Sequence, residues 1–329
     1  MKQLHFYGKN KLGFIEIPDP QPKPGEVIVK TVCSAICGSE MHAYREGMAE
    51  GNPGHEAVGI IEAVGEGVTS VKVGQRVGAS PIAGCGECDF CRKGQYTWCP
   101  DFRFFGSFHS EKFRAAANAV QSLPDDVEWD SAVLLTGDGF GVPYHTAQKV
   151  WPQSNFVAIF GAGPIGLGNV IMQHYLGRKI AIVDICADRL DFARQLGADW
   201  VINPAETDVV AEIKLLTNGL GADLCLECAG RPETVRNCFD AVRTGGQVIF
   251  NGEQGSVPLS ISEDYIRRDI TACGSWFYHF GEFSAMLELF RKGLPVGELI
   301  SHRFSFEEAP EAYSLFAAGK TAKVLMFYP

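Results

Sequence analysis

The chain has 329 residues, enough for two domains of about 100–200 residues each. Its net charge of −10 disfavours a general DNA-coating role, because phosphate binding needs a basic face. No apolar run reaches the roughly 20 residues that span a bilayer, and the N-terminus lacks the apolar core of a signal peptide. We therefore expect a cytoplasmic protein with no nucleic-acid or membrane partner.

Residues 1 to about 135 are predicted to form a β-rich region. Short apolar segments such as 26–30 and 58–64 alternate with turn signals that contain Gly and Pro. Cys37 follows one predicted strand, and His55 comes shortly afterwards. One thiolate and one imidazole suit zinc, and an open catalytic site needs only three protein ligands. By themselves, these two residues could equally be ordinary buried residues.

Four cysteines follow within fifteen residues, in the pattern C-x2-C-x2-C-x7-C, namely Cys85, Cys88, Cys91 and Cys99. The chain has 11 cysteines and no signal peptide, which argues against a disulfide framework. Four thiolates can close a tetrahedral zinc shell and leave no position for water, so such a site stabilises a loop. The alternatives are buried cysteines or a redox pair. We predict a structural zinc ion here.

Apolar strands alternate with amphipathic helices from about residue 155. The predicted strands cover 155–160, 179–184, 200–202, 223–227 and 247–250, and the predicted helices follow Gly163 and cover 187–196 and 209–216. Buried strands that alternate with helices imply a parallel sheet. The tail after about residue 274 has a mixed pattern, and we expect it to pack on the first domain.

A glycine-rich turn joins the first of these strands to the first helix. It contains Gly161, Gly163 and Gly166, with Pro164 and Ile165 between the last two. The first glycine permits the tight turn, the second lets a pyrophosphate approach the backbone, and the third lets helix and strand pack closely. Free amides and the helix dipole would bind the phosphates. The strand–turn–helix context predicts a dinucleotide site.

Asp184 closes the next predicted strand. Its carboxylate can accept both ribose hydroxyls of NAD and would repel the 2′-phosphate of NADP. The alternative is an aspartate that caps the following turn, and Arg189 could tolerate NADP. The Ala229-Gly230 and Gly245-Gly246 pairs suit a backbone that approaches a cofactor, or plain turns. We expect NAD as the cofactor.

Together these motifs resemble the zinc-containing medium-chain dehydrogenase/reductase family of alcohol, sorbitol and threonine dehydrogenases. The resemblance rests on the segments 37–39 and 54–56, the four-cysteine lobe and the glycine turn. It implies an α/β fold with a β-rich GroES-like catalytic domain, residues 1–138, completed by 274–329. A Rossmann NAD-binding domain, a doubly wound parallel sheet, would occupy 139–273.

The resemblance also implies roles for matching residues. Cys37 and His55 would be ligands of a catalytic zinc ion. Ser39 would hydrogen-bond the substrate hydroxyl and pass its proton outward, with His42 at the solvent end of the relay. Glu56 would lie beside the zinc as an outer or transient ligand. The alternatives are a simple turn hydroxyl for Ser39 and a surface histidine for His42.

The family places the third zinc ligand in the segment that joins the two domains. Asp138 is the only candidate carboxylate there, with Glu56 and His145 as competitors, and the alternative is an aspartate in a Gly-rich turn. Glu40 stands where the family usually has an aspartate that orients the zinc-bound histidine. The stretches 42–54 and 99–106 are short, which would open the substrate cleft.

These expectations combine into a zinc-dependent oxidoreductase that transfers a hydride between a secondary alcohol and NAD. Zinc would act as a Lewis acid on the substrate oxygen, and the nicotinamide would do the redox work. The acidic third ligand, His109 and Glu111 favour polyols, cyclitols or sugar derivatives. Possible wall residues, Phe105, Phe108 and Trp276, would favour a more apolar substrate unless they are core aromatics.

We expect one catalytic and one structural zinc ion per chain, a small alcohol or ketone substrate, and a homodimer or homotetramer. One alternative is a zinc-free quinone or enone reductase of the same superfamily, which would leave the zinc motifs unexplained. The other is a non-enzymatic NAD-binding zinc protein.

Overall fold

The computed structural model describes residues 1–47 and 54–329. It divides into two compact units, which we describe separately. The first unit contains residues 1–141 and 278–329, and the second contains residues 142–277. Among the described residues, no helix combines the length and the apolar character that crossing a bilayer requires.

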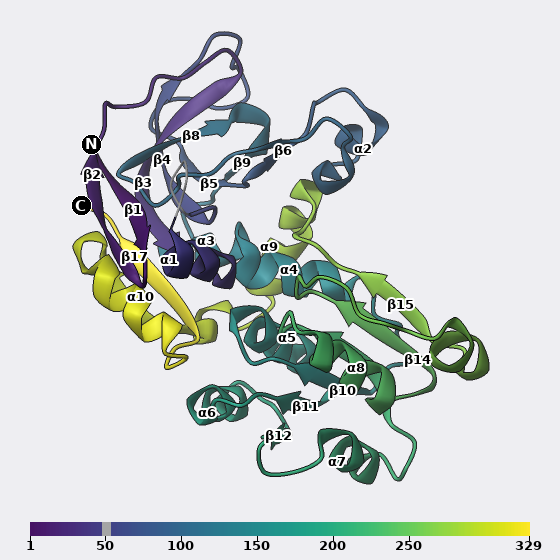
Figure 1. Ribbon diagram of the computed structural model, residues 1–329. Coiled ribbons are helices and arrows are strands. Elements are labelled where there is room, and N and C mark those ends of the chain that lie inside the picture. Colours follow the sequence, from purple (N-terminus) through teal and green to yellow (C-terminus); the bar gives the residue numbers. More distant parts are fainter. Residues whose placement is uncertain (48–53) are drawn as a thin grey trace. The chain divides into compact units, whose positions relative to one another are not determined.

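The second unit is a parallel sheet with helices packed against it (Figure 1). Its strands are β10 (Phe156–Phe160), β11 (Lys179–Val183), β12 (Trp200–Ile202), β13 (Ala222–Glu227), β14 (Val242–Phe250) and β15 (Thr271–Gly274). Its helices are α5 (Pro164–Tyr175), α6 (Ala187–Gln195), α7 (Val209–Leu216) and α8 (Pro232–Ala241). The sheet order β12-β11-β10-β13-β14-β15 confirms the predicted doubly wound fold.

The first unit is built around a mostly antiparallel sheet of order β16-β17-β3-β4-β5-β9, with β8 also paired to β3. Its strands are β3 (Glu26–Ala35), β4 (Ala57–Val64), β5 (Arg76–Ala79), β8 (Lys112–Ala116), β9 (Val120–Ser122), β16 (Ile300–Ser305) and β17 (Lys323–Phe327). Two smaller pairs are β1 (Lys2–Gly8) with β2 (Lys11–Glu16), and β6 (Ile82–Ala83) with β7 (Arg103–Phe104). These elements confirm the predicted β-rich region.

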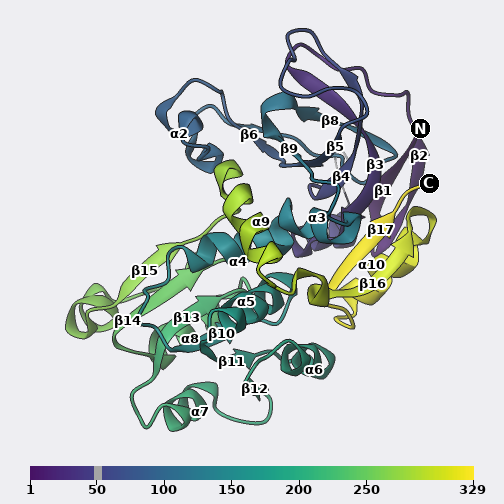
Figure 2. The ribbon, with the colours of Figure 1, turned by 180° about the vertical axis from the view of Figure 1, so that it is seen from behind.

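The tail of the chain belongs to this first unit because β17 pairs antiparallel with β3. Figures 1 and 2 both show the yellow C-terminal segment beside the purple N-terminal strands. A shared apolar cluster that includes Phe6, Ile36, Tyr313 and Met326 joins the tail to the start of the chain. The tail can therefore supply side chains to any site at the end of β3.

The helices of the first unit are α1 (Met41–Glu46), α2 (Asp89–Arg92), α3 (Trp129–Leu135), α9 (Phe283–Arg291) and α10 (Ala309–Ala317), and α4 (Asp138–Ala147) begins in it. The short helical turns of the chain are η1 (Gly38–Glu40), η2 (Tyr96–Trp98), η3 (Ala117–Ala119), η4 (Ile261–Tyr265), η5 (Ile266–Arg268), η6 (Phe280–Glu282), η7 (Val296–Leu299) and η8 (Phe306–Glu308). Among these, η1 carries Ser39 and Glu40, α1 carries His42, and α4 begins at Asp138.

Candidate active site and metal centres

Three of the expected ligands meet in the interior of the first unit. Cys37 follows β3, His55 precedes β4 and Asp138 is the first residue of α4. Antiparallel pairing of β3 with β4 brings the first two together. Oδ2 of Asp138 lies 2.9 Å from Nε2 of His55 and 3.6 Å from Sγ of Cys37. All three are buried, and we call them the Cys37 centre.

The Cys37 centre fits a zinc ion. Thiolate, imidazole and carboxylate are the donors that zinc prefers in an open site. Oδ1 of Asp138 is buried and has no hydrogen-bond partner among the described residues, so it is available to a cation. Burial alone would lower the pKa of His55, but Cys37 and Asp138 raise it well above its usual value. The cluster therefore attracts positive charge.

Glu56 lies within the same group of possible ligands, but the structure gives it other partners. Its Oε1 accepts a bond of 2.5 Å from Nζ of Lys323, and its Oε2 lies 3.4 Å from the backbone nitrogen of Gly139. Both side chains of the ion pair are completely buried. Burial would lower the pKa of Lys323, but Glu56 and Cys37 raise it. The ammonium group therefore balances the charge of Glu56, which leaves Asp138 as the better third ligand.

Glu40 occupies the other side of His55. Its Oε1 lies 3.8 Å from Nδ1 of His55, within ion-pair range but beyond a hydrogen bond. Its carboxylate also meets Nε2 of His109 at 3.2 Å and accepts a 2.6 Å bond from the hydroxyl of Tyr313. Glu40 therefore stands beside His55 at the position where the family usually has an aspartate, and it is itself bonded to His109 and Tyr313.

Two residues considered for the substrate cleft are buried: His109 is not available to a substrate, and Phe108 is a core aromatic, which was the alternative considered for it. His109 is 0% exposed because it faces Ser34 and Glu40, and Phe108 is 0% exposed because it packs on Phe113. Glu111 accepts a hydrogen bond from the backbone nitrogen of Lys2. Because they are buried, His109 and Phe108 cannot line a substrate cleft.

The other features expected to shape the substrate cleft are two aromatic residues and a short stretch of chain. Phe105 is half-buried against the core of the first unit, and Trp276 is exposed in the second unit. Residues 48–53 of the short stretch 42–54 lie outside the described residues.

Ser39 and His42 are exposed on adjoining helical turns, η1 and α1. Residues three apart on a helix lie on the same face, so the two side chains share one side of these turns. Ser39 is two residues from Cys37 in the sequence. This placement suits a route for a proton from the buried ligands to solvent.

The four-cysteine lobe also fits zinc. Ligand atoms of its cysteines all lie within 4.8 Å of one another, and the sulfurs of Cys85 and Cys91 are 3.8 Å apart. A tetrahedron of roughly 2.3 Å zinc–sulfur bonds has corners about 3.8 Å apart. Backbone amides of Glu87 and Cys88 lower the pKa of Cys85 to about 7. The lobe therefore brings its four sulfurs close together, and one pair lies at the spacing that a closed zinc shell requires.

The glycine turn of the second unit has the expected geometry. Gly161 has φ +102°, and a Cβ there would approach the backbone of Ala229 to 2.8 Å. A Cβ on Gly166 would lie 1.8 Å from the carbonyl oxygen of Gly161, so only glycine permits this packing. No atom lies within 4 Å of a Cβ on Gly163, which leaves room for a phosphate. Pro164 and Ile165 begin α5.

Asp184 lies directly after β11 and contacts this turn. Its Oδ2 accepts from the amide of Ala162 at 2.7 Å, and its Oδ1 accepts from the amide of Cys186 at 2.9 Å. It therefore caps the following turn, and each oxygen retains a lone pair for a ribose hydroxyl. Arg189 is half-buried, and its Nε has no hydrogen-bond partner among the described residues. Gly245-Gly246 lies within β14, which favours a structural role for that pair.

Comparisons with known proteins agree with this geometry. The family described as "Alcohol dehydrogenase GroES-like domain" matches residues 23–125, and "Zinc-binding dehydrogenase" matches residues 164–292. The L-threonine 3-dehydrogenase of Pyrococcus abyssi is 33% identical over 99% of this chain and 97% of its own length. The chain belongs to the zinc-containing medium-chain dehydrogenase family.

Two further relatives show the range of this dehydrogenase family. The sorbitol dehydrogenase of Bacillus subtilis is 30% identical over 95% of this chain and 92% of its own. A solved structure from Escherichia coli CFT073, described as a short chain alcohol dehydrogenase complexed with NADH, superposes with a TM-score of 0.87. It is 28% identical, and the match covers 99% of each chain.

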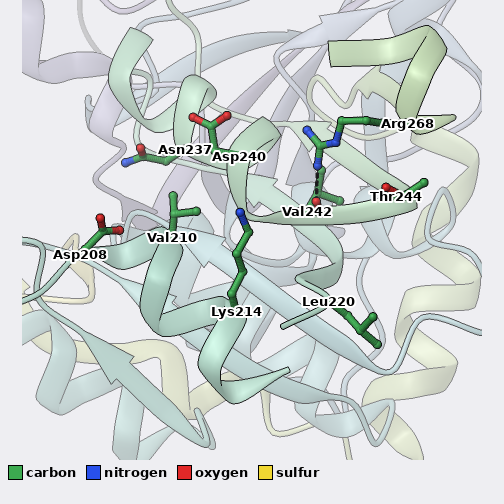
Figure 3. Close-up of a pocket in the computed structure, with 9 residues that line it drawn as sticks. All are labelled: Asp208, Val210, Lys214, Leu220, Asn237, Asp240, Val242, Thr244 and Arg268. Atoms are coloured by element: carbon green, nitrogen blue, oxygen red, sulfur yellow. Dashed lines mark hydrogen bonds between the residues drawn. The ribbon is translucent and has the colours of Figure 1, made fainter. Parts of the chain in front are cut away.

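The second unit of the dehydrogenase has a hollow of about 680 Å³, whose lining residues are drawn in Figure 3. Val242 starts β14 and Leu220 precedes β13, so the hollow lies at the amino ends of these strands. Dinucleotides bind at the carboxyl ends of parallel strands, where Gly161 follows β10. This hollow is therefore separate from the expected nucleotide site.

Replacing Cys88 with serine should release one zinc ion per chain of the dehydrogenase and destabilise the fold. Serine is a poor zinc ligand, and a structural zinc ion contributes directly to folding energy. Zinc content by atomic emission and the melting temperature measure the two effects. Cys273→Ser, which alters a cysteine outside both centres, is the control. Unchanged zinc content in the Cys88 variant would contradict a structural zinc site.

Proposed function

We propose that this dehydrogenase oxidises a secondary alcohol to a ketone with NAD, using a zinc ion at the Cys37 centre and a second, structural ion in the four-cysteine lobe. The observation that carries the proposal is the meeting of Cys37, His55 and Asp138, with one carboxylate oxygen of Asp138 free of protein partners among the described residues. The thiolate and the carboxylate balance the charge of Zn²⁺, and Lys323 balances that of Glu56.

The chain's own residues orient the substrate and move its proton. Zinc supplies Lewis-acid polarisation of the substrate oxygen, and NAD supplies the hydride acceptor when the two are bound. Oγ of Ser39 would accept the proton of the substrate hydroxyl while it passes its own hydrogen on through the ribose of the bound NAD. The exposed imidazole of His42, at the solvent end of this relay, would release a proton to solvent. Glu56, held by Lys323, would lie beside the zinc as an outer ligand.

Polyols, cyclitols and sugar derivatives are the substrates that we favour. The support is the carboxylate ligand together with the likeness to sorbitol dehydrogenase. The likeness to L-threonine 3-dehydrogenase adds a hydroxy amino acid to the compounds worth testing. We also propose a homodimer or homotetramer, which light scattering would measure.

A panel assay tests the function. The zinc-loaded protein is supplied with NAD and with simple secondary alcohols, polyols, cyclitols and L-threonine, and NADH formation is followed at 340 nm. We expect turnover with a secondary alcohol and a loss of that turnover in Cys37→Ser. In a separate assay with NADH or NADPH as the hydride donor, reduction of quinones or enones by protein without zinc would favour the zinc-free reductase. Zinc and NAD binding with no turnover would favour the non-enzymatic alternative.

Replacing Asp184 with glycine should narrow the preference for NAD over NADP. The carboxylate repels a 2′-phosphate, and its removal should change the ratio of the two kcat/KM values by on the order of tenfold or more. The matched control is Asp188→Gly, which removes an exposed carboxylate from the first turn of α6. A wild-type protein that prefers NADP would show that Asp184 does not face the ribose.

A further inference from the structure

A buried polar network lies behind His55, on the side away from Asp138. Glu40 contacts His55, His109 and Tyr313, at 3.8, 3.2 and 2.6 Å respectively. Glu40 lies in η1, and its three partners come from other parts of the first unit: the segment before β4, the segment before β8, and α10. His109 and Tyr313 are completely buried, and Glu40 is nearly so.

The network continues beyond His109. Its Nδ1 lies 2.9 Å from the hydroxyl of Ser34, which in turn lies 3.0 Å from the hydroxyl of Tyr328. If Ser34 donates to Nδ1, the ring carries its proton on Nε2 and donates it to Glu40. Burial of a polar group costs free energy unless the group is hydrogen-bonded. This series of hydrogen bonds therefore fixes which group donates and which accepts at each step.

The local backbone leaves little freedom for His109 to move. Gly54 has φ +102°, and a Cβ there would approach the ring and backbone nitrogen of His109 to 2.6 Å. The carbonyl of Gly54 also accepts a bond from the amide of Phe108. The segment that carries His55 is thus packed directly against the segment that carries His109.

We propose that His109 and Tyr313 are positioning residues that hold the Glu40 carboxylate against Nδ1 of His55, so that Nε2 stays directed at Cys37 and Asp138. The proposal rests on the zinc site proposed above. A carboxylate beside the far nitrogen of a ligating histidine increases the basicity of the ring as a ligand. At 3.8 Å, Glu40 does so through its charge rather than through a hydrogen bond. Glu40 has one more methylene than aspartate, and its two extra partners restrict the freedom that this methylene adds.

A purely structural alternative is that this network only ties α10 to the sheet. The two possibilities differ in what they do to the metal. A structural tie would lower the melting temperature of a variant without changing the metal that the Cys37 centre holds. A positioning network would change the affinity for that metal and its ligand field.

The test compares Tyr313→Phe and His109→Phe with wild type and with Tyr44→Phe. Tyr44 lies in the same aromatic cluster, with its ring 5.7 Å from that of Tyr313, and serves as the matched control. Zinc affinity is measured by competition with a chelator, and the step that disappears in Cys37→Ser identifies the Cys37 centre. The visible absorption of protein with Co²⁺ in place of zinc at that centre reports its ligand field.

We expect both variants to weaken metal binding at the Cys37 centre by roughly 10–100-fold and to shift the Co²⁺ bands. Metal binding in the four-cysteine lobe should be unchanged in both variants. The Tyr44→Phe protein should have the metal affinity and the Co²⁺ spectrum of wild type. Wild-type affinity and spectrum in the variants, with or without a lower melting temperature, would overturn the proposal. Tyr313→Phe removes only a hydroxyl, so it remains informative if the His109 variant does not fold. A wild-type protein that binds metal only in the lobe would overturn the proposed function and this inference together.

Discussion

Asp138→Asn should empty the Cys37 centre of zinc and abolish alcohol oxidation, while NAD still binds. The amide lacks the negative charge that Oδ2 places beside His55 and that Oδ1 offers to a cation. The loss in zinc affinity should exceed the ~10–100-fold that follows removal of a group that only hydrogen-bonds a ligand. Zinc analysis should fall from two ions per chain to one, and NADH binding can be followed by fluorescence.

The control for this variant is Asp125→Asn, because Asp125 is a fully exposed carboxylate of the same unit. It should keep two zinc ions and full activity. Retention of both ions by the Asp138 variant would mean that another residue completes the centre. Glu56 would then be the next candidate, despite its bond to Lys323.

Lys323→Met should destabilise the protein by about 3–5 kcal/mol, the cost of removing one partner from a buried ion pair. Both members of the Lys323–Glu56 pair are completely buried, so the remaining carboxylate would have neither its counter-charge nor water. The free energy of unfolding of the zinc-loaded protein in urea is the measurement. We also expect lower activity, because Glu56 would become free to compete for the metal.

Two companion variants separate charge from packing. Lys320→Met changes an exposed lysine of the same tail and should have little effect on stability. The double variant Lys323→Met/Glu56→Gln should recover part of the loss, since it removes the uncompensated charge. A single Lys323 variant within about 0.5 kcal/mol of wild type would show that the pair does not hold Glu56 in its charged form.

Local sequence signals predicted most of the fold. Periodic apolar segments and the glycine turn identified the parallel sheet, because the strand–turn–helix context lies within a few neighbouring residues. The four cysteines likewise reach one another within a single loop. For the Cys37 centre, the resemblance to the family was needed to select Asp138, since nothing in its local pattern separates a ligand from a turn residue.

The residues that surround the ligands could not be predicted in this way. Lys323 begins an apolar strand 267 residues after Glu56, and a lysine at a strand end normally indicates a surface position. Tyr313 is 273 residues from Glu40. His109 was considered as a polar substrate contact and Phe108 as a wall residue or a core aromatic, but their burial depends on the pairing of distant segments.

The position of β17 between β16 and β3 has a consequence for how the protein matures. The lobe draws its ligands from one short loop, so its closure costs little chain entropy. The Cys37 centre depends on a lysine that is synthesised long after its ligands, and its surroundings form only when β17 joins β3. During synthesis or refolding, the two zinc ions should therefore be acquired in sequence, with the lobe first. The reactive centre would thus stay inert until the chain has folded around it.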